Sequence, residues 1–315
     1  MDDVDINLFR FDFDNTMYQF FMNASGHIYC RYGMRKDGEG EKSNSIEGIK
    51  DAMRKALEIH KKESTKAPPA WKPVETQDLV SFKRDPKRPG GCLHCHHAGF
   101  YLRREEYSIG RLSKEMVWSF PFPQNVGIEL DLDKNTIVKG VTEPAVKAGI
   151  KEGDRILTVD GQRVVTPGDF NWILNSFKTG TLKVGYERDG KNATASIELK
   201  GYDWRKTDIT WRGSWWDSGP NIGLQGDDLS DDEKKKLGIA ADDLAFKIVR
   251  LFPKGSAQPA GLKEGDIITG VDGKSDAMGE IEFQMHLRLA HRMGDQVPIT
   301  FIRNGQKSAM KVTMK

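Results

Sequence analysis

Alternation of apolar and polar residues dominates residues 119–315, and a helix-type pattern interrupts it twice. Asp-Gly or Asn-Gly pairs separate the alternating stretches, which is typical of tight hairpin turns. These pairs stand at 160–161, 189–190, 272–273 and 304–305. Apolar residues at helical spacing predict one amphipathic helix in each half. The helix positions are Phe170, Ile173, Leu174 and Phe177 in the first half and Phe283, His286, Leu287 and Ala290 in the second. Each half therefore has the elements of a small, partly open β-barrel.

An internal repeat indicates that the two halves are copies of one domain. The run Ala-Gly-Ile-Lys-Glu-Gly-Asp at 148–154 returns as Ala-Gly-Leu-Lys-Glu-Gly-Asp at 260–266, offset by 112 residues. A second matched pair, Asn-Val-Gly-Ile at 125–128 and Asn-Ile-Gly-Leu at 221–224, is offset by 96 residues. The difference between the two offsets predicts a charged insertion at 227–243 in the second copy.

The order of these features resembles the PDZ domains of bacterial proteases and scaffolds, over residues 119–200 and 201–315, the second copy having a tryptophan-rich lead-in. In that family a loop before the first strand offers backbone N–H groups to a ligand's C-terminal carboxylate, and the peptide adds as a strand. The resemblance implies two sites for protein or peptide C-termini. Their residues would be Asn125, Val126, Gly127, Ile128 and Phe170 in the first copy and Asn221, Ile222, Gly223, Leu224 and Phe283 in the second. Alternatively, one or both grooves are vestigial and only pack against neighbouring domains.

The first 65 residues predict a hairpin and a helix. Strands are expected at 17–23 and 27–32, followed by a helix from about Ser45 to His60 with Ser45 as its N-cap. This order resembles the C-terminal half of a thioredoxin fold, so residues 1–65 would be a degenerate thioredoxin-like lobe. Asn15 stands where that family has its cis-proline, and the half with the Cys-x-x-Cys pair is missing, so we expect no thiol–disulfide exchange in this lobe.

The run Cys92-Leu93-His94-Cys95-His96 fits the attachment signature of c-type haem. Two thiols at i and i+3 can each add to a porphyrin vinyl group, and the next histidine then ligates the iron. The sequence thus predicts one covalent haem c on Cys92 and Cys95, with His96 as axial ligand and His60 or Met116 as candidates for the sixth position. Met22, Met34, His27 or an open position are further alternatives for that sixth ligand.

Two other interpretations of this segment remain open. Zinc could use Cys92, Cys95 and either His96 or His97, although no second pair of ligands is nearby in the sequence. The cysteines could also form a dithiol or disulfide. In each case residues 66–118 would be a proline-rich linker that carries the site.

Enzymatic signatures are weak. The run Phe-Asp-Phe-Asp-Asn-Thr at 11–16 resembles the first motif of haloacid-dehalogenase phosphatases, in which the first aspartate is the nucleophile. The large body that such a fold needs does not follow this run. The sequence has no Gly-x-Ser-x-Gly, His-Glu-x-x-His or Walker pattern. We therefore expect an electron-transfer or binding protein rather than a hydrolase.

Charge and hydropathy limit the classes of partner that we expect. The 315 residues include 48 basic and 46 acidic residues. The resulting net charge of +2 provides no general attraction for nucleic acid, so we expect no nucleic-acid partner. No apolar run approaches the roughly 18 residues of a membrane span. The acidic N-terminus lacks the features of a secretory signal, but haem c is attached outside the cytoplasm, so we expect a periplasmic or cell-envelope location.

Taken together, the chain resembles bacterial exported proteins that join a degenerate thioredoxin-like lobe, a Cys-x-x-Cys-His segment and tandem PDZ domains. The expected fold class is α+β. The resemblance implies a monohaem c-type cytochrome that acts as an electron-transfer or haem-sensing adaptor, with a redox partner protein and bound peptides. The alternative is a PDZ scaffold or chaperone-like peptide binder with a structural zinc or disulfide at the cysteine pair.

Overall fold

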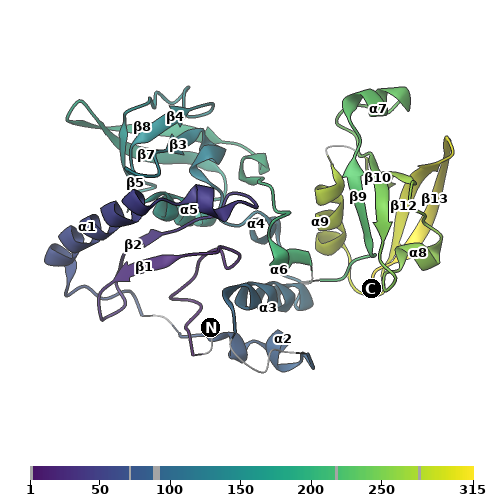
Figure 1. Cartoon of the computed structure of the whole chain (residues 1–315), viewed down its shortest axis with the longest axis horizontal. Helices are drawn as coiled ribbons and strands as arrows, with labels where there is room; N and C mark the ends of the chain where they lie inside the picture. The colour runs from purple at the N-terminus through teal and green to yellow at the C-terminus, as the bar shows by residue number, and fades with distance from the viewer. Residues whose placement is uncertain (1–2, 71, 88–92, 217–218, 276–277) are drawn as a thin grey trace. The chain divides into compact units, whose positions relative to one another are not determined.

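The structure is a computed structural model that describes residues 3–70, 72–87, 93–216, 219–275 and 278–315. The chain forms two compact units (Figure 1), residues 1–105 with 114–214 and residues 106–113 with 215–315. The first unit thus joins the N-terminal lobe and the first PDZ-type module, which the sequence predicts as separate domains. No helix in the described ranges combines the length and the apolarity that crossing a bilayer requires.

The N-terminal lobe contains the predicted hairpin and helix. Strands β1 (Gln19–Met22) and β2 (Ile28–Tyr32) pair antiparallel. After the short 3-10 helix η1 (Gly40–Ser43), helix α1 (Ile46–Glu63) begins at the predicted N-cap, where the amide of Gly48 donates to Oγ of Ser45 at 2.8 Å. A two-stranded sheet and one helix do not by themselves show a thioredoxin-like fold, so that resemblance stays an untested prediction.

The sequence predicts an apolar face on α1 made of Ile46, Ile49, Met53, Ala56, Leu57 and His60, and the structure buries only part of it, with Ala56 in the cluster and Ile49 against it. Ile46, Met53 and Leu57 are 72%, 51% and 63% exposed. Gly48, Ala52 and Ala56 are buried, against a cluster that includes Tyr29, Cys30 and Tyr32 of β2 and Val165. Small side chains on this face let the helix backbone approach bulky tyrosines, so size rather than hydrophobicity selects the packed side.

The predicted linker at 66–118 is largely folded. It contains η2 (Thr76–Asp78) and the helices α2 (Val80–Lys83), α3 (Cys95–Ser108) and α4 (Lys114–Val117). Ala98 and Tyr101 of α3 share a buried cluster with Phe11 and Phe13 of the N-terminal lobe. The start of α3 therefore packs within the first unit, whereas residues 106–113 belong to the second unit.

The first module (residues 119–200) has two sheets and one long helix. Its elements are η3 (Pro123–Val126), β3 (Ile128–Leu130), β4 (Val138–Val141), β5 (Arg155–Val159), β6 (Gln162–Arg163), α5 (Pro167–Ser176), β7 (Gly180–Arg188) and β8 (Lys191–Leu199). β3 pairs with β4, and the other sheet has the order β6-β5-β7-β8. An isolated bridge between Ile137 and Arg155 links the two sheets. The core lies between the sheets and α5.

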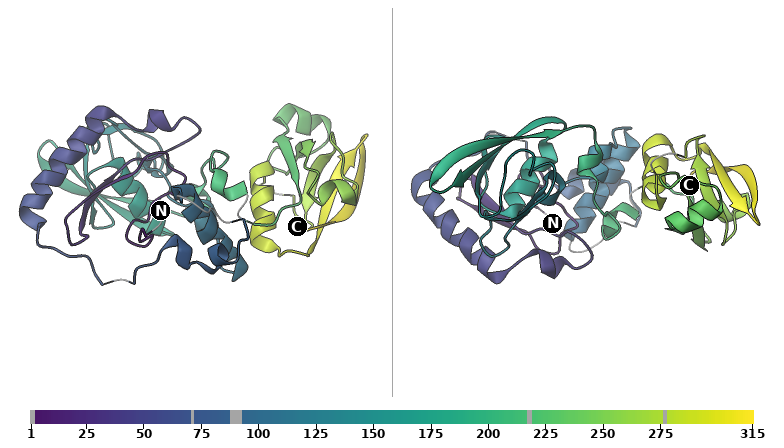
Figure 2. Two further views of the ribbon diagram at one scale, coloured as in Figure 1. Left: turned by 60° about the horizontal axis from the view of Figure 1, so that its bottom comes forward. Right: turned by 90° about the horizontal axis from the view of Figure 1, so that it is seen from above.

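The second module (residues 219–315) follows η4 (Asp203–Arg205) and α6 (Gly213–Trp216). Its elements are β9 (Leu224–Asp228), α7 (Asp231–Lys236), β10 (Phe246–Leu251), α8 (Ala257–Ala260), β11 (Ile267–Val271), α9 (Glu280–Ala290), β12 (Gln296–Arg303) and β13 (Gln306–Thr313). The sheet order β13-β12-β11-β10-β9 makes β9 an edge strand. Figure 1 shows α9 beside β9, and the left view of Figure 2 shows the helix on the same side of the sheet.

The predicted turns and insertion are confirmed. Asp160, Asp189, Asp272 and Asn304 all have positive φ between 46° and 52°, as the first residue of a two-residue hairpin turn requires. Helix α7 lies within the predicted insertion at 227–243 and is specific to the second module.

Candidate peptide-binding edges

Strand β3 presents an open edge in the first module. The carbonyl of Gly127 accepts from the amide of Thr142 at 2.9 Å, and the amide of Asp131 donates to Ile137 at 2.8 Å. Because alternate residues of a strand direct their backbone groups to opposite edges, Ile128 and Leu130 direct theirs away from β4. Among the described residues, no other segment forms a hydrogen bond with the backbone of Ile128 or Leu130. This edge therefore has backbone groups without partners, as an added strand needs, but Ile128 and Leu130 are only 0% and 4% exposed, so a ligand strand would have to move the side chains that cover them.

The corresponding edge of the second module is closed. By the 96-residue offset, Leu224 and Gly226 of β9 correspond to Ile128 and Leu130. The amide of Phe252 donates to the carbonyl of Gly223 at 2.9 Å, which matches the contact at Gly127 in the first copy. On the outer edge, Nε2 of Gln284 donates to the carbonyl of Leu224 at 3.1 Å. The amide of Gly226 donates to the carboxylate of Glu280.

We call Glu280 and Gln284 the α9 clasp, because they bind the backbone of Leu224 and Gly226 on the outer edge of β9. They are only 9% and 4% exposed, and Nε2 of Gln284 donates to Oε1 of Glu280 at 3.0 Å. Nη1 of Arg288 donates to the carbonyl of Gln284 at 3.0 Å. Burial raises the pKa of Glu280 above its ordinary value, although the hydrogen bond from Gln284 opposes this. An added strand at β9 would have to displace these side chains.

The first module has no counterpart of the clasp. With Phe170 aligned on Phe283, Glu280 and Gln284 correspond to Pro167 and Asn171. Proline provides no carboxylate, and Nδ2 of Asn171 donates to the carbonyls of Phe120 and Pro121. The polar side chains of α5 thus bind the preceding segment of chain and form no hydrogen bond with the backbone of β3.

The N-terminal lobe limits the length of the open edge. Oγ of Ser45 donates to the carbonyl of Leu132, in the turn that follows β3, at 3.2 Å. Gly48 lies so close that an added Cβ would overlap this carbonyl oxygen. The hydroxyl of Tyr32 donates to the carbonyl of Ser45 at 2.6 Å and fixes the start of α1 there. A ligand strand can therefore extend along Ile128–Leu130 for about three or four residues, given a rise of about 3.3 Å per residue.

The apolar side chains that were expected to line the grooves lie in the two module cores. They are Val126, Ile128 and Phe170 in the first module and Ile222, Leu224 and Phe283 in the second. Because all six side chains are covered, the backbone edge, and not a pocket of these side chains, distinguishes the two modules. Ligand contacts by these residues stay predictions.

The two expected carboxylate-binding loops are bonded to their own chain. In the first, the amides of Asn125 and Gly127 donate within the turn, to Phe122 and Gln124, and Nδ2 of Asn125 donates to Trp204 at 2.8 Å. In the second, the amide of Asn221 donates to the carbonyl of Lys315 at 2.9 Å. Gly127 and Gly223 have φ of 82° and 76°, which explains glycine at both positions.

The cysteine–histidine segment is described only in part, because Cys92 lies outside the described residues. Cys95 begins α3, and His96 is exposed on its first turn. After the histidines, Ala98 is buried and a Cβ at Gly99 would lie 3.1 Å from Phe13. That face of α3 is therefore occupied by the N-terminal lobe. Covalent haem or zinc at Cys92 and Cys95 stays an untested prediction.

The two candidates for a sixth haem ligand have other surroundings. Nδ1 of His60 is 2.6 Å from the hydroxyl of Tyr29 in β2. Met116 lines a cavity of about 160 Å³ together with residues such as Phe13, Leu102 and Arg103. In the described ranges, no contact joins His96 to either side chain.

The aspartates of the phosphatase-like run are held in buried ion pairs. Asp12 lies 2.7 Å from Arg212, and Asp14 lies 2.6 Å from Arg103 and accepts from the hydroxyl of Ser214 at 2.5 Å. Burial raises the pKa of Asp12, although Arg212 opposes this. These contacts tie the N-terminal lobe to α3 and to the segment at 212–214, which is a sufficient structural role for both carboxylates.

Comparison with known proteins supports the PDZ interpretation. Residues 125–199 match the family model described as PDZ domain. A probable periplasmic serine endoprotease DegP-like from Pseudomonas putida (strain W619) is 27% identical over 155 residues, covering 47% of this chain and 32% of the relative. The protein of the same name from Halomonas elongata is 27% identical over 207 residues, covering 62% of this chain and 39% of the relative. The solved HtrA-type protease AlgW with decapeptide matches at 17% identity and a TM-score of 0.25, over 42% of this chain and 41% of that chain.

These comparisons correct one expectation. The chain spans about a third of the length of the curated relatives it matches. Those relatives are named as endoproteases and not as cytochromes, so the interpretation as a monohaem cytochrome for electron transfer or haem sensing is wrong. The PDZ-type binding alternative agrees better with the comparisons.

Proposed function

We propose that this protein is a peptide-binding scaffold of the periplasm, in which the first module takes the C-terminal residues of a protein or peptide as a strand added to β3. The observation that carries the proposal is a difference between the modules. Among the described residues the backbone of Ile128 and Leu130 has no partner on its outer edge, whereas the corresponding edge of the second module is bonded to α9. The names of the relatives support the periplasmic location. The proposal is limited to binding, and the cysteine pair is assigned no more than a structural zinc or disulfide.

The ligand chemistry follows from the edge. Main-chain hydrogen bonds provide the affinity in strand addition, so the ligand needs an extended backbone with free amides at alternate positions. Because Ser45 and Gly48 end the edge at Leu132, only a short segment fits, and a chain terminus meets this limit better than an internal loop.

The test is binding of a fluorescent library of C-terminal peptides to the full chain, followed by backbone editing of the best binder. N-methylation at alternate residues should abolish binding, while N-methylation at the intervening residues should leave the affinity within a few-fold. Amidation of the peptide's C-terminus should weaken binding if the protein binds the free carboxylate. Equal tolerance of N-methyl groups at every position would show that no strand is added.

Hydrogen exchange of the backbone amides can locate the peptide site, with the second module as the internal control. A bound peptide should slow exchange of the amides of Ile128 and Leu130, and it should leave Leu224 and Gly226 unchanged because the clasp already covers that edge. Protection at β9 without protection at β3 would overturn the assignment to the first module.

A further inference from the structure

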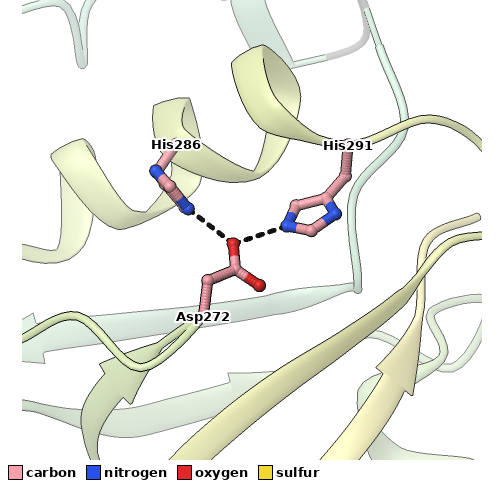
Figure 3. Close-up of side chains that lie close together, drawn as sticks. All are labelled: Asp272, His286 and His291. Atoms are coloured by element: carbon pink, nitrogen blue, oxygen red, sulfur yellow. Dashed lines mark hydrogen bonds and ion pairs between the residues drawn. The ribbon is translucent and has the colours of Figure 1, made fainter.

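Three side chains of the second module converge on one point (Figure 3). Nε2 of His286 and Nε2 of His291 each lie 2.7 Å from Oδ2 of Asp272. Asp272 stands in the turn after β11, His286 lies on α9, and His291 caps the end of that helix. The three side chains are 22%, 18% and 14% exposed, so the point is sheltered but accessible from solvent.

This set of atoms is suited to a divalent transition metal. One atom from each of the three residues lies within 4.8 Å of the others. Two imidazole nitrogens and one carboxylate oxygen are ligands that zinc commonly takes in tetrahedral sites, where a fourth position can remain open to water.

A second carboxylate stands behind one of the imidazoles. Oδ2 of Asp295 is 3.7 Å from Nδ1 of His291. Metal-binding histidines usually direct their other ring nitrogen to a carboxylate or carbonyl, which fixes the tautomer that leaves Nε2 free for the metal. At 3.7 Å the pair is longer than a hydrogen bond, so a modest shift of the Asp295 side chain would be needed for its carboxylate to accept a hydrogen bond from Nδ1–H of His291.

We infer that Asp272, His286 and His291 form a zinc site, with water completing the coordination. On binding, zinc replaces the two Nε2–H groups that now donate to Asp272, and each neutral imidazole carries its proton on Nδ1 instead. The ion then fastens the end of α9 to the turn after β11, and α9 is the helix that carries the clasp over β9.

The site belongs to the second copy alone. The turn aspartate has a counterpart in the first module, Asp160, but the position of His286 corresponds to Ile173 there. The PDZ-type fold therefore does not require these histidines. A histidine that replaces an isoleucine at a half-buried helix position needs a polar partner. The turn aspartate does not need the histidine, since the first module has Asp160 without one.

Zinc titration of the full chain by calorimetry, with circular dichroism to check folding, tests the site. Wild type should bind zinc, and the variants His286→Gln and His291→Gln should each weaken binding at Asp272 by 10-fold or more, since each removes a ligand. Glutamine keeps a donor for the Asp272 carboxylate, so loss of zinc binding without loss of folding separates metal ligation from a purely structural hydrogen bond. The matched control is the triple variant His94→Gln, His96→Gln and His97→Gln. These three histidines lie together in the cysteine segment and are not ligands of the proposed site.

Cobalt substitution distinguishes the two candidate zinc sites. Cobalt at the Asp272 site should give visible absorption without a thiolate charge-transfer band, because the site contains no sulfur, and His286→Gln should abolish that absorption. The inference is overturned if the His286→Gln and His291→Gln variants bind zinc as tightly as wild type, or if all cobalt absorption carries thiolate character.

Discussion

Gly223 and Gly255 lie against each other in the second module so closely that a Cβ on either would overlap the Cα of the other. Gly223 belongs to the loop before β9, and Gly255 lies in the turn after β10, whose neighbour Ser256 donates its amide to Ile222 at 2.9 Å. The contact holds the loop at the start of β9 in place and so sets the register in which Leu224 and Gly226 meet the clasp.

Replacing Gly255 by alanine should therefore destabilise the second module. The added methyl has only backbone to meet, and overpacking of this kind costs about 1–3 kcal/mol. Urea unfolding of the full chain, followed in the second unit, measures the loss. Gly219→Ala is the control, because its nearest neighbours would lie at the ordinary contact distance of 3.8 Å. Equal stability of the two variants would contradict the close contact.

Removing the clasp should create a second binding edge. In the double variant Glu280→Ala and Gln284→Ala, the backbone of Leu224 and Gly226 loses its side-chain partners and becomes available to a strand. Calorimetry with a peptide that binds the first module should then show a stoichiometry that rises from one towards two.

Glu280→Gln is the matched control for this experiment. Its amide oxygen still accepts from the amide of Gly226, so the edge should stay closed and the stoichiometry should stay at one. A double variant that folds and still binds one peptide would show that the clasp does not block β9.

Ser45 should stabilise the first unit through two contacts at once. Its hydroxyl caps α1 by accepting from Gly48 at 2.8 Å and donates to the carbonyl of Leu132 at 3.2 Å. Ser45→Ala should cost about 0.5–2 kcal/mol, the usual range for loss of an N-cap. Thermal unfolding of the full chain measures this loss. Ser64→Ala, at the other end of α1, is expected to leave the stability unchanged.

The stability of the first unit should fall in acid through Glu63. The hydrogen bond from His27 and the neighbouring Arg163 lower the pKa of this carboxyl from 4.5 to about 2. A folded-state pKa below the unfolded value stabilises the protein above about pH 4.5, and this contribution is lost as the pH falls towards 2. Urea unfolding at a series of pH values should show a shallower acid decline in Glu63→Gln than in wild type. Parallel declines would mean that other carboxylates control the acid response.

Local signals were sufficient for much of the fold. The Asp-Gly and Asn-Gly pairs predicted hairpin turns because positive φ demands those residues, and the structure confirms positive φ at each one. Ser45 was predicted as a helix cap for an equally local reason, the need of the first amides for an acceptor. The repeat at 148–154 and 260–266 predicted two similar modules, since one sequence pattern specifies one packing arrangement.

Contacts between distant segments were not predictable in the same way. The face of α1 was predicted only in part: Ile49 and Ala56 do pack against β2, but Met53 and Leu57 are exposed and Ala52 is buried, because the tyrosines of β2 favour small residues there. The clasp was missed because Gln284 has an ordinary helix-surface character until β9 is placed beside it. The one available signal was comparative: His286 and Gln284 stand in the second copy where the first has Ile173 and Asn171.

The α9 clasp also decides how many partners the tandem can hold. If peptides bind at β3 as proposed, the clasp over β9 leaves the two similar modules with a single binding site, and the protein would be monovalent despite its duplicated sequence. A partner that displays two identical tails on one surface should bind with the affinity of one tail, without the avidity that two linked sites would give. Each tail of such a partner would bind its own copy of the protein. The protein would then cover the assembly without cross-linking it.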